Sequence, residues 1–192
     1  MITSTSADRR QDNVLRLPDG RMLGYAEYGD PAGPPVMFFH GLPGSRVSGR
    51  LGDEAARERR VRLIAPDRPG FGLSSFQPKR VILDWTHDVT ALANALGIGR
   101  FAVGGVSGGG PYAAACAFAL GPRLTGAAII SGIAPGDMPR LTDGMMPTNR
   151  VLFGAARRLP PISNAITAVN GPTAAESTAP HDGDDATGVP SR

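Results

Sequence analysis

The sequence is poor in the residues that support disulfides and metal sites. Its 192 residues contain one cysteine, Cys116, and three widely separated histidines, His40, His87 and His181. A single cysteine excludes a disulfide within the chain and is typical of a reducing compartment, so we expect a cytoplasmic protein in which Cys116 is a buried thiol. Histidines this far apart predict no metal site. No motif indicates a cofactor.

Long apolar runs and a strong charge of one sign are also lacking. No stretch is long and apolar enough for a membrane span or for the core of a signal peptide, so we expect no membrane partner. The sequence isoelectric point is about 9.6, but the net charge is only +3. The one arginine-rich cluster, residues 57–62, falls at the end of an expected helix, where cations favour the helix dipole. We therefore expect no nucleic-acid partner.

The most informative segment runs from Phe101 to Tyr112 and predicts a short strand, a sharp turn and the start of a helix. Ser107 stands at the turn in the pattern Gly-x-Ser-x-Gly, between Gly105 and Gly109. Such a turn holds a serine hydroxyl out at the carboxyl end of a sheet. Side chains at the two glycine positions would collide with the neighbouring strand and helix. Because Pro111 stands where a phosphate-binding loop needs lysine, we interpret the turn as a nucleophile elbow.

Two further segments precede the elbow. Residues 36–46 predict an apolar strand that runs into His-Gly-x-Pro-Gly, and residues 62–75 predict another that runs into Asp-Arg-Pro-Gly-Phe-Gly. Together with Gly-x-Ser-Gly-Gly-Gly-Pro at the elbow, these motifs resemble the esterase-like branch of the α/β-hydrolase superfamily over about residues 20–158. The resemblance implies an α/β fold with a mostly parallel sheet of about six strands flanked by helices.

The resemblance also implies roles for the residues that match the family's motifs. Ser107 would be the nucleophile that attacks a carboxylic ester or similar acyl bond of a small molecule. The backbone N–H groups of Leu42 and Gly108 would form the oxyanion hole. His40 matches the histidine that ends the third strand of the family, where it supports the loop and is not the base. The expected supporting residues are His40, Gly41, Gly105 and Gly109.

The expected elements divide the chain into four segments. Residues 1–13 are polar and are expected to be frayed. Residues 14–135 alternate between strands and helices and would form an incomplete α/β-hydrolase core. Residues 136–168 would be the start of a lid. Residues 169–192 are rich in small and polar residues without periodicity, a composition that predicts disorder.

Apolar patterning places the other elements of the core. Trp85, Val89, Leu92 and Leu96 follow helical spacing and should be buried against the sheet. Asp67 is expected to brace its turn, because proline and glycine follow closely after it. The remaining expected elements are helices over residues 51–60, 107–120 and 145–159 and strands over residues 13–17, 21–28 and 124–131.

The residues that would activate Ser107 are not found at their expected places. In this superfamily the acid usually follows the seventh strand and the histidine follows the eighth, but no pattern here predicts a strand after the sixth. His181 lies in a polar, low-complexity setting, and Asp137 is interpreted as a loop residue before the lid. His87 is expected to be solvated on its helix. We therefore expect strands 7 and 8 to be missing and the chain to be truncated before the catalytic acid and histidine.

Three interpretations remain open. The chain is a truncated or frame-shifted hydrolase copy, an active hydrolase that borrows His181 or a histidine from a partner chain, or a non-catalytic binding or interaction protein that retains the hydrolase fold. The last one is favoured by the open edge that the strand over residues 124–131 would present, since such an edge invites self-association.

Overall fold

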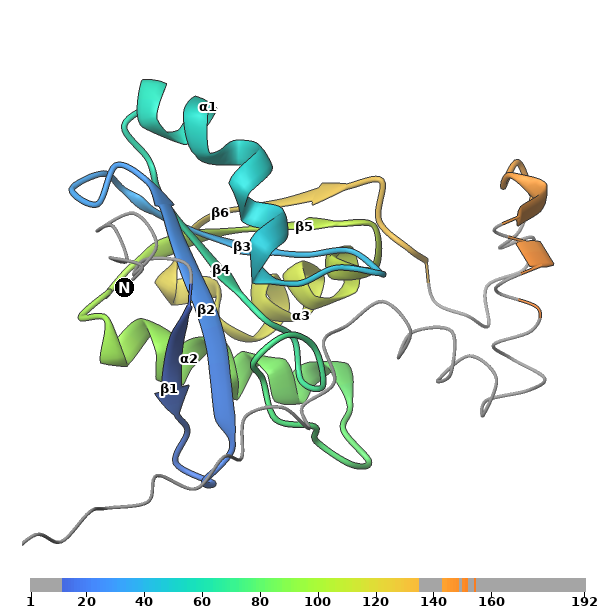
Figure 1. Ribbon diagram of the computed structural model, residues 1–192, viewed down its shortest axis with the longest axis horizontal. Helices are drawn as coiled ribbons and strands as arrows, with labels where there is room; N and C mark the ends of the chain where they lie inside the picture. Colours follow the sequence, from blue (N-terminus) through green and yellow to red (C-terminus); the bar gives the residue numbers. More distant parts are fainter. Residues whose placement is uncertain (1–11, 135–142, 149, 152–153, 155–192) are drawn as a thin grey trace, which may run out of the picture.

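The fold is a six-stranded sheet with helices on both faces (Figure 1). It is seen in a computed structural model that describes residues 12–134, 143–148, 150–151 and 154. The strands are β1 (Asn13–Arg16), β2 (Met22–Gly29), β3 (Pro35–Phe39), β4 (Arg62–Pro66), β5 (Phe101–Val106) and β6 (Leu124–Ile130). The α-helices are α1 (Asp53–Glu58), α2 (Trp85–Ala95) and α3 (Gly110–Ala119). The short 3-10 helices are η2 (Arg46–Gly52), η3 (Ile82–Asp84), η4 (Ser107–Gly109) and η5 (Gly121–Arg123).

The strand order places three consecutive loops at one edge of the sheet. The order is β1-β2-β4-β3-β5-β6, in which β1 and β2 are antiparallel to their neighbours and β4, β3, β5 and β6 run parallel. Parallel neighbours need crossover connections, and the helices between these strands provide them. Because parallel strands end at the same edge, the loops after β3, β4 and β5 meet there. The predicted mostly parallel sheet of six strands flanked by helices is confirmed.

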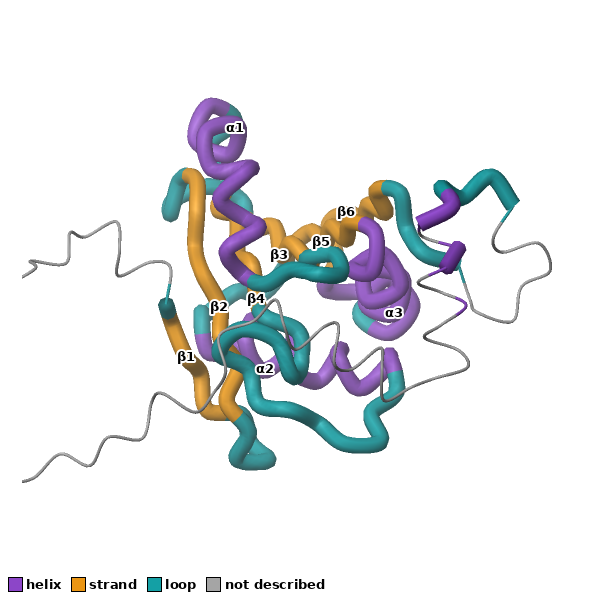
Figure 2. The backbone as a smooth tube through the Cα atoms, turned by 45° about the vertical axis from the view of Figure 1, so that its right-hand side comes forward, coloured by secondary structure: helices purple, strands orange, loops and turns teal. Residues whose placement is uncertain are grey.

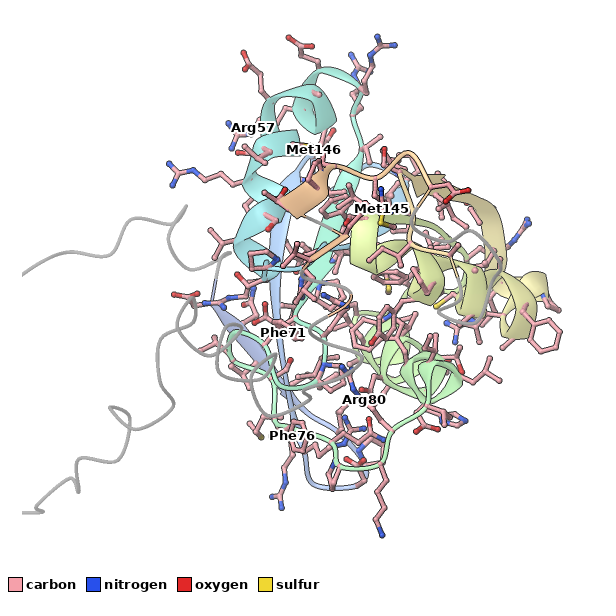
Figure 3. All side chains as sticks on the ribbon, turned by 90° about the vertical axis from the view of Figure 1, so that its right-hand side faces the viewer. Arg57, Phe71, Phe76, Arg80, Met145 and Met146 are labelled. Carbon is pink, nitrogen blue, oxygen red and sulfur yellow. The ribbon has the colours of Figure 1, made fainter. Side chains whose placement is uncertain are left out.

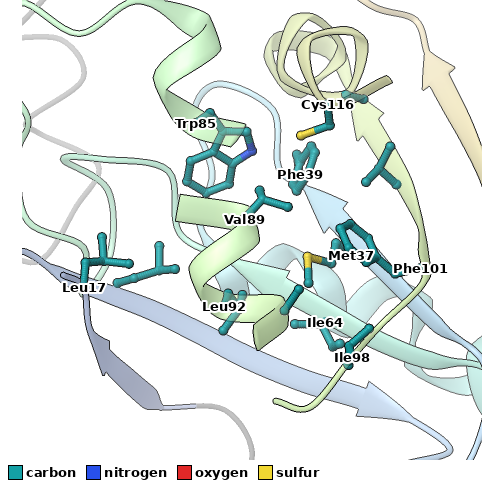
Figure 4. Packing of buried hydrophobic residues seen from close by; sticks show 14 residues of the cluster. Leu17, Met37, Phe39, Ile64, Trp85, Val89, Leu92, Ile98, Phe101 and Cys116 are labelled. Atoms are coloured by element: carbon teal, nitrogen blue, oxygen red, sulfur yellow. The ribbon is translucent and has the colours of Figure 1, made fainter. Parts of the chain in front are cut away.

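The larger hydrophobic cluster lies between the sheet and the pair α2 and α3 (Figure 4). Trp85, Val89 and Leu92 of α2 are buried in it, as their spacing predicted, and Leu96 is packed against it half-buried. The rings of Trp85 and Phe39 meet edge to face with centroids 5.4 Å apart. α1 lies on the opposite face of the sheet (Figure 2), where a smaller cluster packs beneath it and η2. Burial on both faces explains why the central strands are so apolar.

Two expected helices begin differently from the prediction. The helix expected over residues 51–60 starts earlier, as η2 at residue 46, and continues as α1. A methyl group on Gly49 would lie 2.7 Å from a ring carbon of Tyr28, so the chain packs too closely there for most side chains. The helix expected over residues 107–120 begins as η4 before it becomes α3. A first turn of 3-10 type is common at the start of a helix.

β6 is the outer strand of the sheet within the described residues, and it pairs there with β5 alone. Ile129 is 56% exposed and Ile130 is 53% exposed. An apolar strand with one unpaired edge offers its backbone N–H and C=O groups to another chain.

Several predictions fall on residues that the structure does not describe. The start of the segment expected to be frayed, up to residue 11, the expected tail, and most of the expected lid lie outside the described residues. The described positions 147–148, 150–151 and 154 of the lid segment are helical. The fold begins inside the segment expected to be frayed, because Asn13 starts β1 and Asp12 forms an ion pair with Arg46. Where the chain is described, it contains no helix with the length and hydropathy of a membrane span.

Candidate active site

Ser107 occupies a strained turn directly after β5. Its φ is 50°, in the left-handed region that residues other than glycine rarely adopt. This conformation costs about 1–2 kcal/mol for a residue with a Cβ, and such strain persists where the surrounding structure over-determines it. The side chain is half-buried at the carboxyl end of the sheet. The predicted sharp turn between a strand and a helix is therefore present.

The two glycines that flank Ser107 are required by close packing of the backbone. A methyl group on Gly105 would lie 2.3 Å from the carbonyl oxygen of Gly109. One on Gly109 would lie 2.2 Å from the carbonyl oxygen of Phe39. Real Cβ atoms do not approach backbone oxygen atoms so closely, and the steric reason predicted for both glycines holds in the structure.

The loop after β3 lies directly against this turn. A methyl group on Gly41 would lie 3.3 Å from Cβ and 3.9 Å from Oγ of Ser107. One on Gly108 would lie 3.5 Å from the amide nitrogen of Leu42. The structure therefore brings Ser107, Leu42 and Gly108 together, although they come from two loops. Two backbone amides beside a serine hydroxyl form an arrangement that can stabilise negative charge on a substrate oxygen.

His40 is held within the loop by both of its ring nitrogens. The backbone N–H of Arg68 donates to Nε2 at 3.1 Å, so Nδ1 carries the proton and donates to the carbonyl oxygen of Gly41 at 2.9 Å. The ring also meets Phe71 edge to face, and only 1% of the residue is exposed. Burial, together with the charge of Arg68, lowers the pKa of His40 to about 3. His40 is therefore neutral near pH 7, and it has no free nitrogen to offer to Ser107.

The chain matches one family model over residues 34–159, and the description of that model is the alpha/beta hydrolase fold. The chain belongs to this family. A non-heme chloroperoxidase of Streptomyces lividans is 33% identical over 124 residues, which cover 64% of this chain and 45% of that protein. A proline iminopeptidase of Xylella fastidiosa is 30% identical over 126 residues, which cover 64% of this chain and 40% of that protein. The chain thus spans less than half the length of the curated relatives it matches.

A solved structure extends the similarity to the fold. The crystal structure of a putative aryl esterase from Burkholderia cenocepacia aligns with a TM-score of 0.58 and 25% identity. The alignment covers 82% of this chain and 66% of the esterase chain. The strand order and the placement of helices described above are accordingly those of an α/β-hydrolase core, as the sequence motifs predicted.

Asp67 braces the turn between β4 and α2 of this α/β-hydrolase core, as expected from its neighbours in the sequence. It is fully buried and accepts hydrogen bonds from the backbone N–H of Leu73 at 2.8 Å and from Nη1 of Arg46 at 3.0 Å. Burial raises the pKa of Asp67, and these hydrogen bonds oppose that effect. A methyl group on Gly72 would lie 2.1 Å from its carboxylate. The carboxylate is thus engaged by its own turn and by Arg46 of η2.

Arg68 is a residue of the site that sequence analysis did not single out. Its guanidinium donates to the carbonyl oxygen of Gly41 at 2.8 Å and to that of Gly108 at 3.2 Å. Only 4% of the residue is exposed. Its position, directly after a buried strand and before Pro-Gly, was the one available signal, because nothing else in the sequence distinguishes it from the other arginines.

The other candidate residues are not brought to Ser107. Asp137 and His181 lie outside the described residues, and His87 is exposed on α2. Cys116 is buried in α3, and burial raises the pKa of its thiol to about 12, so it is a poor nucleophile. In the part of the chain that the structure describes, no three His, Cys, Asp or Glu side chains gather as metal ligands would.

A cavity of about 600 Å³ opens beside Ser107. Apolar side chains of β3, β4 and β5 form much of its wall, together with Leu42 from the loop after β3. Ser48 of η2 supplies a second hydroxyl, and Leu51, which is 94% exposed, lies at its rim. The cavity can accept an apolar group of a molecule whose carbonyl lies at Ser107.

Proposed function

We propose that this chain carries the nucleophile and the oxyanion site of a serine hydrolase that acts on carboxylic esters or similar acyl bonds. Ser107 attacks the carbonyl carbon, and the N–H groups of Leu42 and Gly108 receive the negative charge that develops on the carbonyl oxygen. The observation that carries the proposal is the left-handed φ of Ser107 beside the loop of Gly41 and Leu42. The esterase among the similar structures supports an ester substrate.

The apolar cavity supports a substrate with a hydrophobic acyl or alcohol group. It lies beside both Ser107 and Leu42, so a carbonyl held by the Leu42 amide would place one of its substituents there. Burial of apolar surface contributes about 25 cal/mol per Å² to binding. A small ester with an aromatic or aliphatic group is therefore the favoured substrate class.

We further propose that the described part of the chain lacks the base that would activate Ser107. A serine hydroxyl is a weak nucleophile without a base. His40 is the histidine beside this site, and both of its nitrogens are engaged. Loss of the base of a serine triad lowers kcat by roughly 10⁴- to 10⁶-fold. That factor corresponds to about 5–8 kcal/mol of transition-state stabilisation, which a base from elsewhere must supply.

A fluorophosphonate probe tests the proposal directly. We expect slow labelling of the wild-type chain, faster labelling when imidazole is added as an external base, and none in Ser107→Ala. Ser48→Ala is the matched control, because Ser48 lines the same cavity and should not be the labelled hydroxyl. Labelling of the wild type that is no higher than that of Ser107→Ala at every imidazole concentration would contradict the role of Ser107 as nucleophile. Rapid turnover of 4-nitrophenyl acetate without imidazole that persists in His181→Gln would contradict the absence of a base in the described residues.

A second candidate function is that of a non-catalytic interaction protein that associates with a second copy of itself through β6. The exposed side chains of Ile129 and Ile130 at the outer strand favour it. Charged residues at a strand edge oppose pairing with another chain. Sedimentation velocity should therefore show a concentration-dependent dimer that Ile129→Lys abolishes. Phe118→Lys is the control, because Phe118 is an apolar residue on α3 that is even more exposed, at 84% against 56% for Ile129. A monomer at all concentrations would exclude this candidate.

A further inference from the structure

Arg68 is a buried cation for which the described residues offer no carboxylate partner. The ion pairs of the described chain involve other arginines, and the Nε–H of Arg68 has no hydrogen-bond partner there. Burial lowers the pKa of Arg68, yet an arginine stays protonated in a protein. A buried charge without a carboxylate is unfavourable unless other contacts offset it. The contacts that Arg68 does make therefore indicate what it does.

Two aromatic rings and two carbonyl groups hold this charge. Cζ of Arg68 lies 4.8 Å from the ring centroid of Phe71, in the loop after β4 (Figure 3), and 5.0 Å from that of Tyr112 on α3. Cation–π contacts of this kind are favourable when they are shielded from water. Nη2 donates to Gly41 and Nη1 donates to Gly108, so one guanidinium bridges the two loops that meet at the nucleophile.

The carbonyl of Gly41 belongs to the same peptide unit as the N–H of Leu42. A peptide unit is planar, with C=O and N–H pointing in opposite directions. Hydrogen bonds that fix the carbonyl of Gly41 therefore fix the direction of the Leu42 N–H. That carbonyl receives two of them, from Arg68 at 2.8 Å and from His40 at 2.9 Å. A cation on the carbonyl also polarises the unit and strengthens its N–H as a donor.

The peptide units on both sides of Gly108 are restrained in the same way. The carbonyl of Ser107 shares a unit with the N–H of Gly108 and accepts the N–H of Ile133 at 3.2 Å. The carbonyl of Gly108 belongs to the next peptide unit and accepts a hydrogen bond from Nη1 of Arg68. Gly108, which has no side chain to limit its conformation, is thus fixed through the carbonyl of Ser107 and through its own.

We propose that Arg68 is a positioning residue for the oxyanion site. It holds the N–H of Leu42 through the carbonyl of Gly41. Together with Ile133, it restrains Gly108 so that the N–H of Gly108 keeps the orientation that receives the oxyanion. The inference rests on the proposed function, since an oxyanion forms only where Ser107 attacks a carbonyl. A planar guanidinium presents its donors as a fork that can reach both carbonyls at once, whereas the compact ammonium of lysine is a point charge.

Two variants and two measurements test this role in the full chain. Arg68→Met removes the charge and the fork, and Arg68→Lys keeps the charge but loses the fork. Arg123→Met is the matched control, because Arg123 also donates to two backbone carbonyls, those of Ile98 and Gly99, and lies over Phe101 at the opposite end of β5. The first measurement is the NMR order parameter of the Leu42 and Gly108 N–H vectors. The second is fluorophosphonate labelling with imidazole, separated into its maximal rate and its half-saturating probe concentration.

We expect the order parameter of Leu42 to fall from about 0.85 to below about 0.6 in both Arg68 variants and to stay unchanged in Arg123→Met. The maximal labelling rate should fall about 10- to 100-fold, less than the roughly 100- to 1,000-fold loss of a whole oxyanion donor. The half-saturating concentration should change little, because the probe's apolar contacts remain. Unchanged Leu42 and Gly108 order parameters in Arg68→Lys and Arg68→Met overturn the role. Absence of labelling in the wild type would instead refute the proposed function. The NMR order parameters would still show whether Arg68 holds the two N–H groups, because they do not depend on labelling.

Discussion

Burial of His40 makes the stability of this fold dependent on pH. The pKa of His40 is about 3 in the folded chain, because the ring is buried beside Arg68, and about 6.5 in an unfolded chain. The unfolded chain therefore binds the proton first as the pH falls. The contribution of His40 is fully present above pH 6.5 and is lost progressively as the pH falls toward 3.

The size of the effect follows from the two pKa values. One group that is protonated only in the unfolded chain changes the free energy of unfolding by about 1.36 kcal/mol per pH unit. Because the change begins only near pH 6.5, the loss between pH 7 and pH 5 is about 2 kcal/mol. His40→Gln removes the titration but leaves an amide that can accept from Arg68 and donate to Gly41.

Urea unfolding at pH 7 and pH 5, followed by the fluorescence of the buried Trp85, measures this difference. The wild-type chain should lose about 2 kcal/mol more than His40→Gln between the two pH values. His87→Gln is the matched control, because His87 is exposed, and it should behave like the wild type. Equal losses in the wild type and in His40→Gln would refute the argument, because they would show that His40 titrates alike in the folded and unfolded chains.

Three further changes test the packing around the site and the fold. Ser107→Gly should raise the free energy of unfolding by about 1 kcal/mol in urea titrations, because glycine adopts the φ of 50° without strain; a lowered value would contradict stored strain. Gly109→Ala should lower it by about 1–3 kcal/mol, since its methyl group would lie 2.2 Å from a β3 carbonyl oxygen. Gly121→Ala, with nothing within 4 Å of its methyl group, should have little effect in the same assay. Asp88→Asn should lower the thermal midpoint, because it removes the carboxylate, only 3% exposed, that pairs with Arg21 at 2.6 Å. The cost should be less than the about 3–5 kcal/mol of a fully broken buried pair, since the exposed Asp19 remains paired with Arg21.

The strands and the elbow could be predicted because their signals are local in the sequence. Alternation over residues 21–28 predicted β2 to within one residue, and the apolar run over residues 124–131 predicted β6. The glycines around Ser107 were equally informative, since the contacts that exclude a side chain there follow from the geometry of any strand that turns sharply into a helix. Periodicity and turn chemistry act between near neighbours, so one sequence suffices to detect them.

Buried polar partners could not be predicted, because they join distant positions. Arg21 and Asp88 are 67 residues apart, and their contact depends on how the turn between β1 and β2 lies beside α2. For Arg68 the position before Pro-Gly was the one signal, because its hydrogen-bond partners lie in the loops after β3 and β5. The close approach of Gly49, inside η2, to Tyr28 is another contact between positions that are distant in the sequence.

Among the described residues, the contacts that shape the elbow come from residues between the end of β3 and the turn after β6. The carbonyl of Gly41 is held by His40 and Arg68, and that of Ser107 is held by Ile133. None of these hydrogen bonds needs a group beyond the described residues, so the orientation of the two amides does not depend on the catalytic acid or base. Ser107 itself is half-buried beside an open cavity. A base that reaches its hydroxyl, whether free imidazole or another segment, would therefore meet two amides that are already held in place at the proposed oxyanion site. For this reason we expect imidazole to accelerate labelling without a preceding conformational step.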